Sequence, residues 1–140
     1  MESEQLRQFL PLDISMQCVV NYRQRRDDAL AIVDTIEREG GRAIAVQGDV
    51  ASESDDVRIF GTVDKELGGI TALVNNAATF ETQARLESVD TARLQRIFAT
   101  NVFGPFLCSR EAVKRMSTRH GGWGGNIVNI SSVAARGVTR

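Results

Sequence analysis

The sequence predicts an α/β fold, namely a partial Rossmann-type, doubly wound parallel sheet. Short apolar strands alternate with amphipathic helices from residue 16 onward. Strands joined through helices run parallel and have right-handed connections. Glycine pairs or glycine-rich turns follow three of the predicted helices, as expected at helix ends. We expect residues 1–15 to be an atypical N-terminal segment and residues 16–140 to form one partial domain.

The first half of the chain contains two strand–helix units. The apolar segment 16–22 predicts a strand, and apolar residues recur at helical spacing within 25–41. A second strand is predicted over 42–50. Ser52 then stands where a helix N-cap is expected, and Asp55 three residues later is placed as in a capping box.

The second half repeats this order with a longer helix. Residues 70–78 are almost continuously apolar, which is typical of a strand covered on both faces. A helix is predicted over residues 90–119, with a kink caused by Pro105, because proline cannot donate to the carbonyl four residues earlier. The last strand is predicted at 126–130.

Composition excludes several classes of function. The 140 residues are 42% hydrophobic and 25% charged, with a formal net charge of −1 and no long apolar run. We therefore expect no membrane segment and no signal peptide. Cys18 and Cys108 form no disulfide or zinc pattern, which favours the cytoplasm and no metal site. The single histidine, His120, argues against a Ser-His-Asp hydrolase. The basic residues within 110–119 have no aromatic residues between them and fit the solvated face of a helix, so we expect no nucleic-acid partner.

Polar or small residues follow every predicted strand. The carboxyl ends of parallel strands are where open α/β sheets bind ligands. Such residues also end strands for local turn reasons, but four matching ends together indicate a ligand crevice. They are Asn21, Tyr22 and Arg23; Asp49 and Val50; Asn75, Asn76, Ala77 and Ala78; and Ser131 and Ser132.

Four motifs in this order and spacing resemble the short-chain dehydrogenase/reductase family. They are Asp49-Val50, NNAA at 75–78, NVFG at 101–104 and IVNISS at 127–132. The resemblance covers about residues 16–135. It implies an NAD(P)(H)-dependent oxidoreductase that transfers hydride between a nicotinamide cofactor and a small carbonyl or alcohol substrate.

The resemblance also implies cofactor-binding roles. Asp49 would accept a hydrogen bond from the adenine amino group, and the Val50 amide would meet a ring nitrogen. Asn75 would steady the sheet beside the cofactor, while Ala77 and Ala78 would line the adenosine ribose. Ala78 stands where the family has glycine, so an extra methyl group would face the cofactor. Taken alone, the NNAA motif has a less favoured alternative, a plain strand-to-loop turn.

The residues after the first strand bear on the choice of cofactor. Asn21, Tyr22 and Arg23 occupy this end, and the next acidic residue is Asp27. A carboxylate would suit the 2′-hydroxyl of NAD, whereas an arginine suits the 2′-phosphate of NADP. We therefore expect NADP, with NAD as the alternative. The competing interpretation is that Arg23 begins a solvated helix face.

Two residues are the candidates for catalytic roles. The resemblance implies that the Asn101 carbonyl holds a water in a proton relay, and Pro105 would leave that carbonyl without a helical partner. A kink tolerated for packing alone is the alternative. Ser132 matches the family's catalytic serine, with Ser131 as the alternative, and would stabilise charge on the substrate oxygen.

The sequence departs from the family pattern in two places. The family's catalytic Tyr-x-x-x-Lys motif has no counterpart, since Tyr22, Lys65 and Lys114 all precede Ser132. No glycine precedes the first strand, so the glycine-rich phosphate loop is missing.

From these departures we expect weak cofactor binding and an incomplete chain, truncated at both ends and inactive alone. The strand order of this fold class predicts that loss of the central strand separates the first two strands from the last two. Pro11 argues against residues 5–12 filling that gap.

A second class of function stays open. The chain could be a non-enzymatic interaction protein that pairs with an intact family member, or forms a homo-oligomer, through helix 90–119. A methyltransferase-like nucleotide binder is a more distant alternative, because its glycine signature is also missing.

Overall fold

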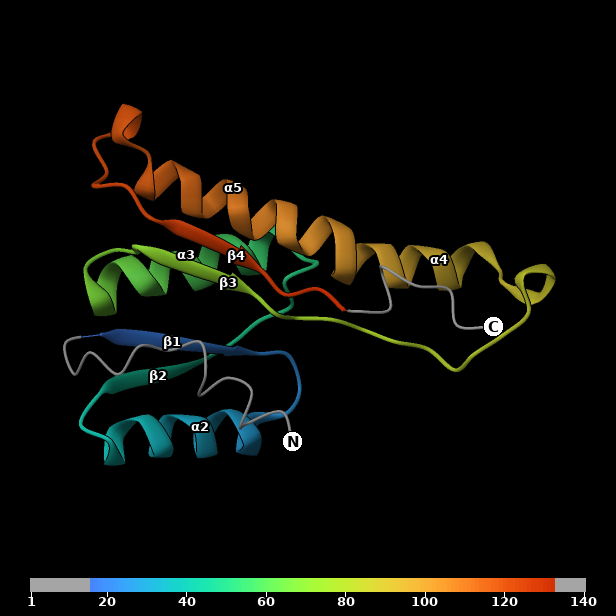
Figure 1. The fold of residues 1–140 in the computed structure, drawn as a ribbon, viewed down its shortest axis with the longest axis horizontal. Coiled ribbons are helices and arrows are strands. Elements are labelled where there is room, and N and C mark those ends of the chain that lie inside the picture. Colours follow the sequence, from blue (N-terminus) through green and yellow to red (C-terminus); the bar gives the residue numbers. More distant parts are fainter. Residues whose placement is uncertain (1–15, 133–140) are drawn as a thin grey trace.

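Two separate pairs of parallel strands form the framework of the fold (Figure 1). The computed structural model describes residues 16–132. β1 (Gln17–Tyr22) pairs with β2 (Arg42–Gln47), and β3 (Ala72–Asn75) pairs with β4 (Asn126–Asn129). Within the described residues no strand joins β1 to β3. The α/β class and the parallel pairing confirm the predictions.

Helices cover the strand pairs unequally. α2 (Arg26–Arg38) packs on β1 and β2, while α3 (Glu53–Leu67) packs on both strands and on α5 (Gly104–Met116). α5 in turn packs on β3. No hydrogen bonds join the two strand pairs among the described residues, so the packing of α3 on α5 is a main connection between these two halves.

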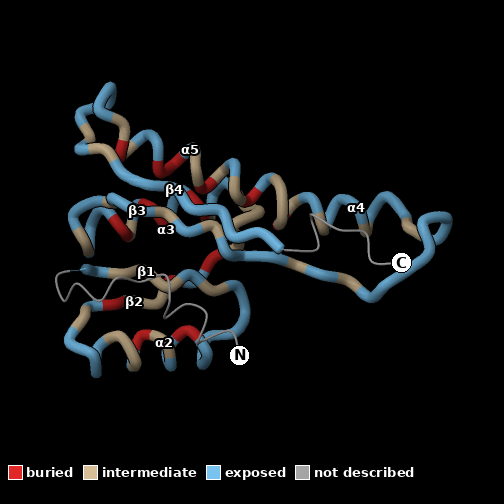
Figure 2. The backbone as a smooth tube through the Cα atoms, viewed as in Figure 1, coloured by how far each residue is buried: buried red, intermediate tan, exposed pale blue. Residues whose placement is uncertain are grey.

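The core lies along this contact between helices. Ile59 and Phe60 of α3 meet Cys108, Ala112 and Met116 of α5, with Val46 of β2 beneath them. Figure 2 shows the buried positions concentrated on the helices and β2, whereas β4 is exposed. The apolar residues at helical spacing in the two helices therefore form one shared core.

The ends of α3 follow the predicted chemistry, with one difference. The Ser52 side chain accepts a hydrogen bond from the Asp55 N–H, and Gly68 ends the helix in the left-handed conformation at φ 77°. In a capping box the Asp55 side chain would bond back to the N–H of the N-cap residue. Here the Asp55 carboxylate instead accepts from the N–H of Asp49 at 2.8 Å. Asp55 thereby fixes the loop that follows β2.

The helix predicted over 90–119 is divided into segments. Asp90 caps α4 (Thr91–Phe98) by accepting from the Arg93 N–H at 2.7 Å. A π-helical turn, η2 (Ala99–Phe103), joins α4 to α5, and Pro105 lies in the first turn of α5. The disturbance expected at Pro105 is therefore a widened turn, which accommodates a residue that has no N–H donor. Short 3₁₀ helices lie on either side, η1 (Leu86–Ser88) and η3 (Thr118–His120).

The expectation that the third predicted strand is covered on both faces is wrong. β3 alternates between exposed and intermediate residues, and all four residues of β4 are exposed. Val74 is 42% exposed and Val128 41%. Among the described residues α5 covers only one face of this pair, which explains why apolar side chains remain in contact with solvent.

Residues 16–132 include no helix that is both long enough and apolar enough to cross a bilayer. The segment 5–12 lies outside the described residues.

Candidate functional site

The carboxyl ends of β1, β2 and β3 surround a hollow of about 170 Å³. It receives residues from the loops after β1, β2 and β3 and from the π-helical turn. Seven of the eight predicted cofactor-binding residues line it, and Asn75 does not. The lining residues are Asn21, Tyr22, Arg23, Gly48, Asp49, Val50, Ala77, Ala78, Thr79 and Thr100.

Asn21 joins the ends of the first two strands. Its side-chain amide donates to the carbonyls of Val46 and Gly48, both at 3.1 Å. The Gly48 N–H donates to the Tyr22 carbonyl at 2.9 Å, which extends the pairing of β1 and β2 by one residue. Both amide protons of Asn21 thus hold the wall of the hollow in place.

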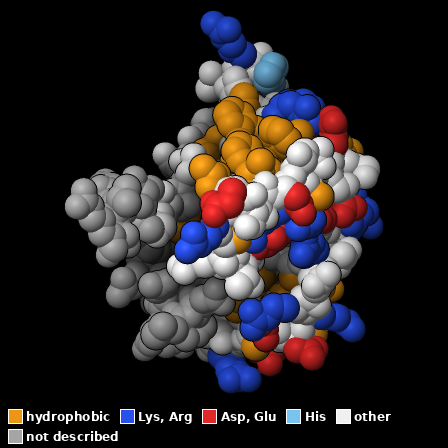
Figure 3. Space-filling model, turned by 90° about the vertical axis from the view of Figure 1, so that its right-hand side faces the viewer, with side chains coloured by type: hydrophobic (Ala, Val, Ile, Leu, Met, Phe, Trp, Pro, Cys, Tyr) orange, Lys and Arg blue, Asp and Glu red, His pale blue; other side chains and the backbone are white. Residues whose placement is uncertain are grey.

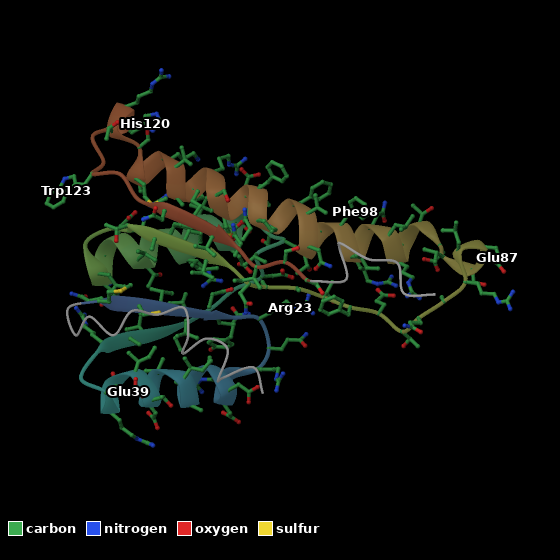
Figure 4. All side chains as sticks on the ribbon, viewed as in Figure 1. Arg23, Glu39, Glu87, Phe98, His120 and Trp123 are labelled. Atoms are coloured by element: carbon green, nitrogen blue, oxygen red, sulfur yellow. The ribbon has the colours of Figure 1, made fainter. Side chains whose placement is uncertain are left out.

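Arg23 and Asp49 form an ion pair at the mouth of the hollow. Arg23 Nη1 lies 3.5 Å from Asp49 Oδ2, and their side chains are 51% and 34% exposed. In Figure 4 Arg23 lies beyond the end of β1, between the two halves of the fold. A guanidinium has five N–H donors, so one long ion pair leaves it the capacity to bind an anion as well.

The loop after β2 is fixed from both sides. Asp49 accepts from the Ala51 N–H at 2.9 Å and donates its own N–H to Asp55. Arg58 donates to the Gln47 carbonyl at 2.8 Å and to Asp55 at 3.0 Å. The hydrogen bond from the Asp49 N–H, and then that from Arg58, lower the pKa of the Asp55 carboxyl. Asp55 therefore remains ionised at neutral pH and keeps the loop in position.

The Asn101 side chain bonds to the loop after β3 through both its oxygen and its nitrogen. It accepts from the Thr79 N–H at 2.7 Å and donates to the Thr79 carbonyl at 2.9 Å. This pair of bonds satisfies the amide that the sequence places among apolar residues. The side chain of Asn101 thus holds Thr79 at the hollow, while the relay role of its carbonyl stays a prediction.

Asn75 lies outside the hollow and joins three elements. Its side chain donates to Asn129 Oδ1 of β4 at 2.8 Å and to Ser109 Oγ of α5 at 3.2 Å. Its carbonyl accepts from the Ile130 N–H at 3.0 Å. These contacts suit the steadying role that the family resemblance implies.

The structure does not bring the candidate serines into the hollow. Ser131 and Ser132 follow β4, are exposed, and do not belong to the lining residues. They stand at the same edge as the other strand ends, beside Asn75 through the Ile130 hydrogen bond. Their catalytic role stays a prediction.

Four residues of this region were not identified as site residues from the sequence. Thr79 and Thr100 carry no distinguishing pattern of their own. Gly48 and Gly104 do, because Gly48 directly precedes the Asp49-Val50 motif and Gly104 is the last residue of the NVFG motif. A β-carbon at Gly48 would lie 2.6 Å from Ile59 Cδ1, and one at Gly104 would lie 3.0 Å from Val50 Cγ2.

The described residues contain no candidate metal-binding site. Within residues 16–132 no three His, Cys, Asp or Glu side chains are placed to hold a metal ion together.

Several known proteins are similar to this chain in sequence. The model of the short chain dehydrogenase family matches residues 13–139. An uncharacterized oxidoreductase, YgfF, of Escherichia coli is 44% identical over 117 residues, which are 84% of this chain and 47% of that protein. Glucose 1-dehydrogenase 2 of Bacillus subtilis is 30% identical over 118 residues, or 84% of this chain and 45% of that one.

A solved structure is similar as well. The F98L/F202L mutant of a Serratia marcescens short-chain dehydrogenase/reductase superposes with a TM-score of 0.75 at 29% identity, covering 86% of this chain and 46% of that one. The chain therefore spans about half the length of the relatives it matches. By its matching family model, its relatives and its fold, the chain belongs to the short-chain dehydrogenase/reductase family.

Proposed function

We propose that the hollow binds the adenosine end of NADP(H), with NAD(H) as the weaker ligand, as part of a family oxidoreductase. The observation that carries this proposal is that seven predicted cofactor-binding residues from three loops line one hollow. Asp49 and Val50 would hold the adenine, Ala77 and Ala78 would lie along the ribose, and Arg23 would bind the 2′-phosphate. The nicotinamide would supply the hydride chemistry on a small carbonyl or alcohol.

The hollow suits only part of a dinucleotide. Its volume of about 170 Å³ is well below the roughly 300–1,000 Å³ of pockets that enclose whole small ligands. The Ala78 methyl group further narrows it. We therefore propose that this chain binds the cofactor weakly, through its adenosine end.

Turnover needs groups that these residues do not provide. The 140 residues include Tyr22 as their one tyrosine, and it lines the hollow rather than following Ser132. Ser132 could stabilise negative charge on a substrate oxygen, but hydride transfer also needs a proton donor, and Tyr22 at the hollow does not stand beside Ser132. We propose that these 140 residues alone do not catalyse hydride transfer.

The role of Arg23 can be tested by calorimetric titration of the 140-residue protein with NADP⁺ and NAD⁺. Arg23→Ala should weaken NADP⁺ binding about tenfold or more, because a charge-assisted hydrogen bond is lost, and should change NAD⁺ binding little. Arg25→Ala is the matched control, since Arg25 is 77% exposed and pairs with Asp28. Equal losses for both nucleotides, or equal effects of the two substitutions, would contradict the proposal.

A second function is favoured by the exposed apolar face of the long helical region. Phe98 is 49% exposed, Phe103 58% and Phe106 76%. Figure 3 shows hydrophobic side chains gathered on one face of the molecule. Since large exposed apolar patches mark interaction sites, we propose that this region could pair with a second copy or with an intact family member.

Sedimentation analysis tests the pairing function. It should detect self-association or a complex with an intact family member. Phe106→Glu should abolish it, whereas Trp123→Glu should not, because Trp123 is 96% exposed but lies outside these helices. A wild-type monomer that binds no family member would contradict this second function.

A further inference from the structure

A buried carboxylate lies in the contact between α3 and α5. Asp56 of α3 is 0% exposed, and its Oδ2 atom has no hydrogen-bond partner. Its Oδ1 atom accepts only from the thiol of Cys108 on α5, at 3.4 Å. A thiol is a weak donor, so the carboxylate is buried with little compensation for its lost hydration.

The charges around Asp56 do not neutralise it. On α5, Glu111 adds repulsion, and Arg110 gives the weakest of the effects on this carboxyl. Arg110 instead pairs with Glu53, and Glu111 is held by Lys114 and Arg115. On α3 itself, Asp55 adds further repulsion.

The strands beneath α3 offer no compensating charge. β1 and β2 present the apolar Val19, Ile44 and Val46 to this core. Cys18 alternates with Val19 along β1, so its side chain points to the opposite face of the strand. Asp56 is thus a buried acid surrounded by apolar groups, a thiol and other acids.

We propose that Asp56 is a proton-sensitive element: when it is protonated the α3–α5 contact tightens, and when it is ionised the contact loosens. This contact is a main connection between the two strand pairs among the described residues. The protonation state of Asp56 therefore affects how the two halves of the fold are arranged.

The same contact reaches the hollow. Cys108 lies one helical turn after Gly104, whose backbone packs against Val50. Val50 lines the hollow and lies in the loop that leads to α3. On the proposed nucleotide-binding function, which this step requires, loosening at Asp56 weakens nucleotide binding by separating Val50 from Gly104.

The direction of the pH dependence follows from burial. Desolvation, the largest cause, raises the pKa of Asp56 from 3.8 to about 6. Above pH 6 the folded protein carries a buried charge, and this destabilises it. As the pH falls from 6 towards 4 the folded form takes up a proton that the unfolded form does not, so stability rises. A shift of about two units corresponds to about a 100-fold change in the folding equilibrium constant.

Urea unfolding of the nucleotide-free protein between pH 4.5 and 7.5 tests the proposal. Asp56→Asn should raise the folding equilibrium constant at pH 7.5, by up to about 100-fold, and this gain should shrink towards pH 4.5. Asp34→Asn is the matched control, because Asp34 is 64% exposed on α2 and pairs with Arg38. Asp34→Asn should leave the pH dependence of the folding equilibrium constant the same as in the wild type.

Two further measurements keep the outcomes distinct. Carboxyl ¹³C NMR of the wild type should show one aspartate that titrates near pH 6, even if Asp56→Asn does not fold. The ratio of NADP⁺ dissociation constants, wild type over Asp56→Asn, should exceed 1 at pH 7.5 and approach 1 at pH 5.

An Asp56→Asn protein with unchanged or lower stability at pH 7.5, or the absence of any aspartate titrating near pH 6, would overturn the proposal. A ratio of 1 at pH 7.5 would overturn the link to the hollow. Failure of NADP⁺ to bind any variant would overturn the proposed function and leave the unfolding test to decide on Asp56.

Discussion

Gly104 lies so close to Val50 that even a β-carbon at Gly104 would require Val50 to move by a few tenths of an ångström. A β-carbon at Gly104 would stand 3.0 Å from Val50 Cγ2 and 3.3 Å from the Val50 carbonyl oxygen. This contact places the start of α5 against the loop after β2. It therefore joins the two halves of the fold next to the hollow.

Gly104→Val should destabilise the protein by about 1–3 kcal/mol, because the added methyl groups must displace the Val50 backbone. Gly61→Ala on α3 is the control. A β-carbon there meets nothing within 4 Å, so alanine should raise the free energy of unfolding by about 0.5–1 kcal/mol. Denaturant unfolding measures both, and a Gly104→Val protein as stable as the wild type would show that this contact is not tight.

Asn75→Ala should lower the free energy of unfolding by about 1–3 kcal/mol, because β3 loses its side-chain bonds to both β4 and α5. Ser109→Ala removes only one of these bonds and should cost less. In the double variant the two effects should not add, since both substitutions remove the same 3.2 Å bond. Full additivity in chemical unfolding would mean that this bond contributes nothing.

Asp55→Asn should destabilise the protein at neutral pH, and the loss should disappear in acid. The pKa of Asp55 is lowered in the folded protein, so its ionised form contributes stability above its ordinary pKa. That contribution is lost as the pH falls through the lowered folded value. Thermal unfolding of wild type and variant from pH 7 to pH 2 checks this, with Ser54→Ala as a control on the same turn. A constant difference between the two proteins at all pH values would exclude the ionic role.

Much of the fold could be predicted from the sequence. Hydrophobic periodicity locates the strands and helices, and Pro105 marks the segment where the helix widens into a π turn. The family motifs predict which residues meet at the strand ends, because parallel strands place their carboxyl ends together.

The remainder depends on contacts between elements. The sequence around Asp56 reads as an acidic first turn suited to a helix N-terminus. Only the packing of α5 onto α3 buries this side chain. Likewise, the apolar runs of β3 and β4 indicate full burial. Burying both faces of these strands requires a helix on each face, and among the described residues α5 covers one face. The partner of Asp55 also differs from the local capping pattern, because Asp49 offers its N–H from the preceding loop.

The central claim is that residues from both strand pairs form one nucleotide-binding hollow. Two-dimensional ¹H–¹⁵N NMR of the 140-residue protein during titration with NADP⁺ tests it most directly. The amide signals of Tyr22, Arg23, Asp49, Val50 and Ala78 should shift together with a single dissociation constant, while those of Glu39 and Trp123 should not. Shifts confined to one strand pair, or no shifts at millimolar NADP⁺, would contradict the claim.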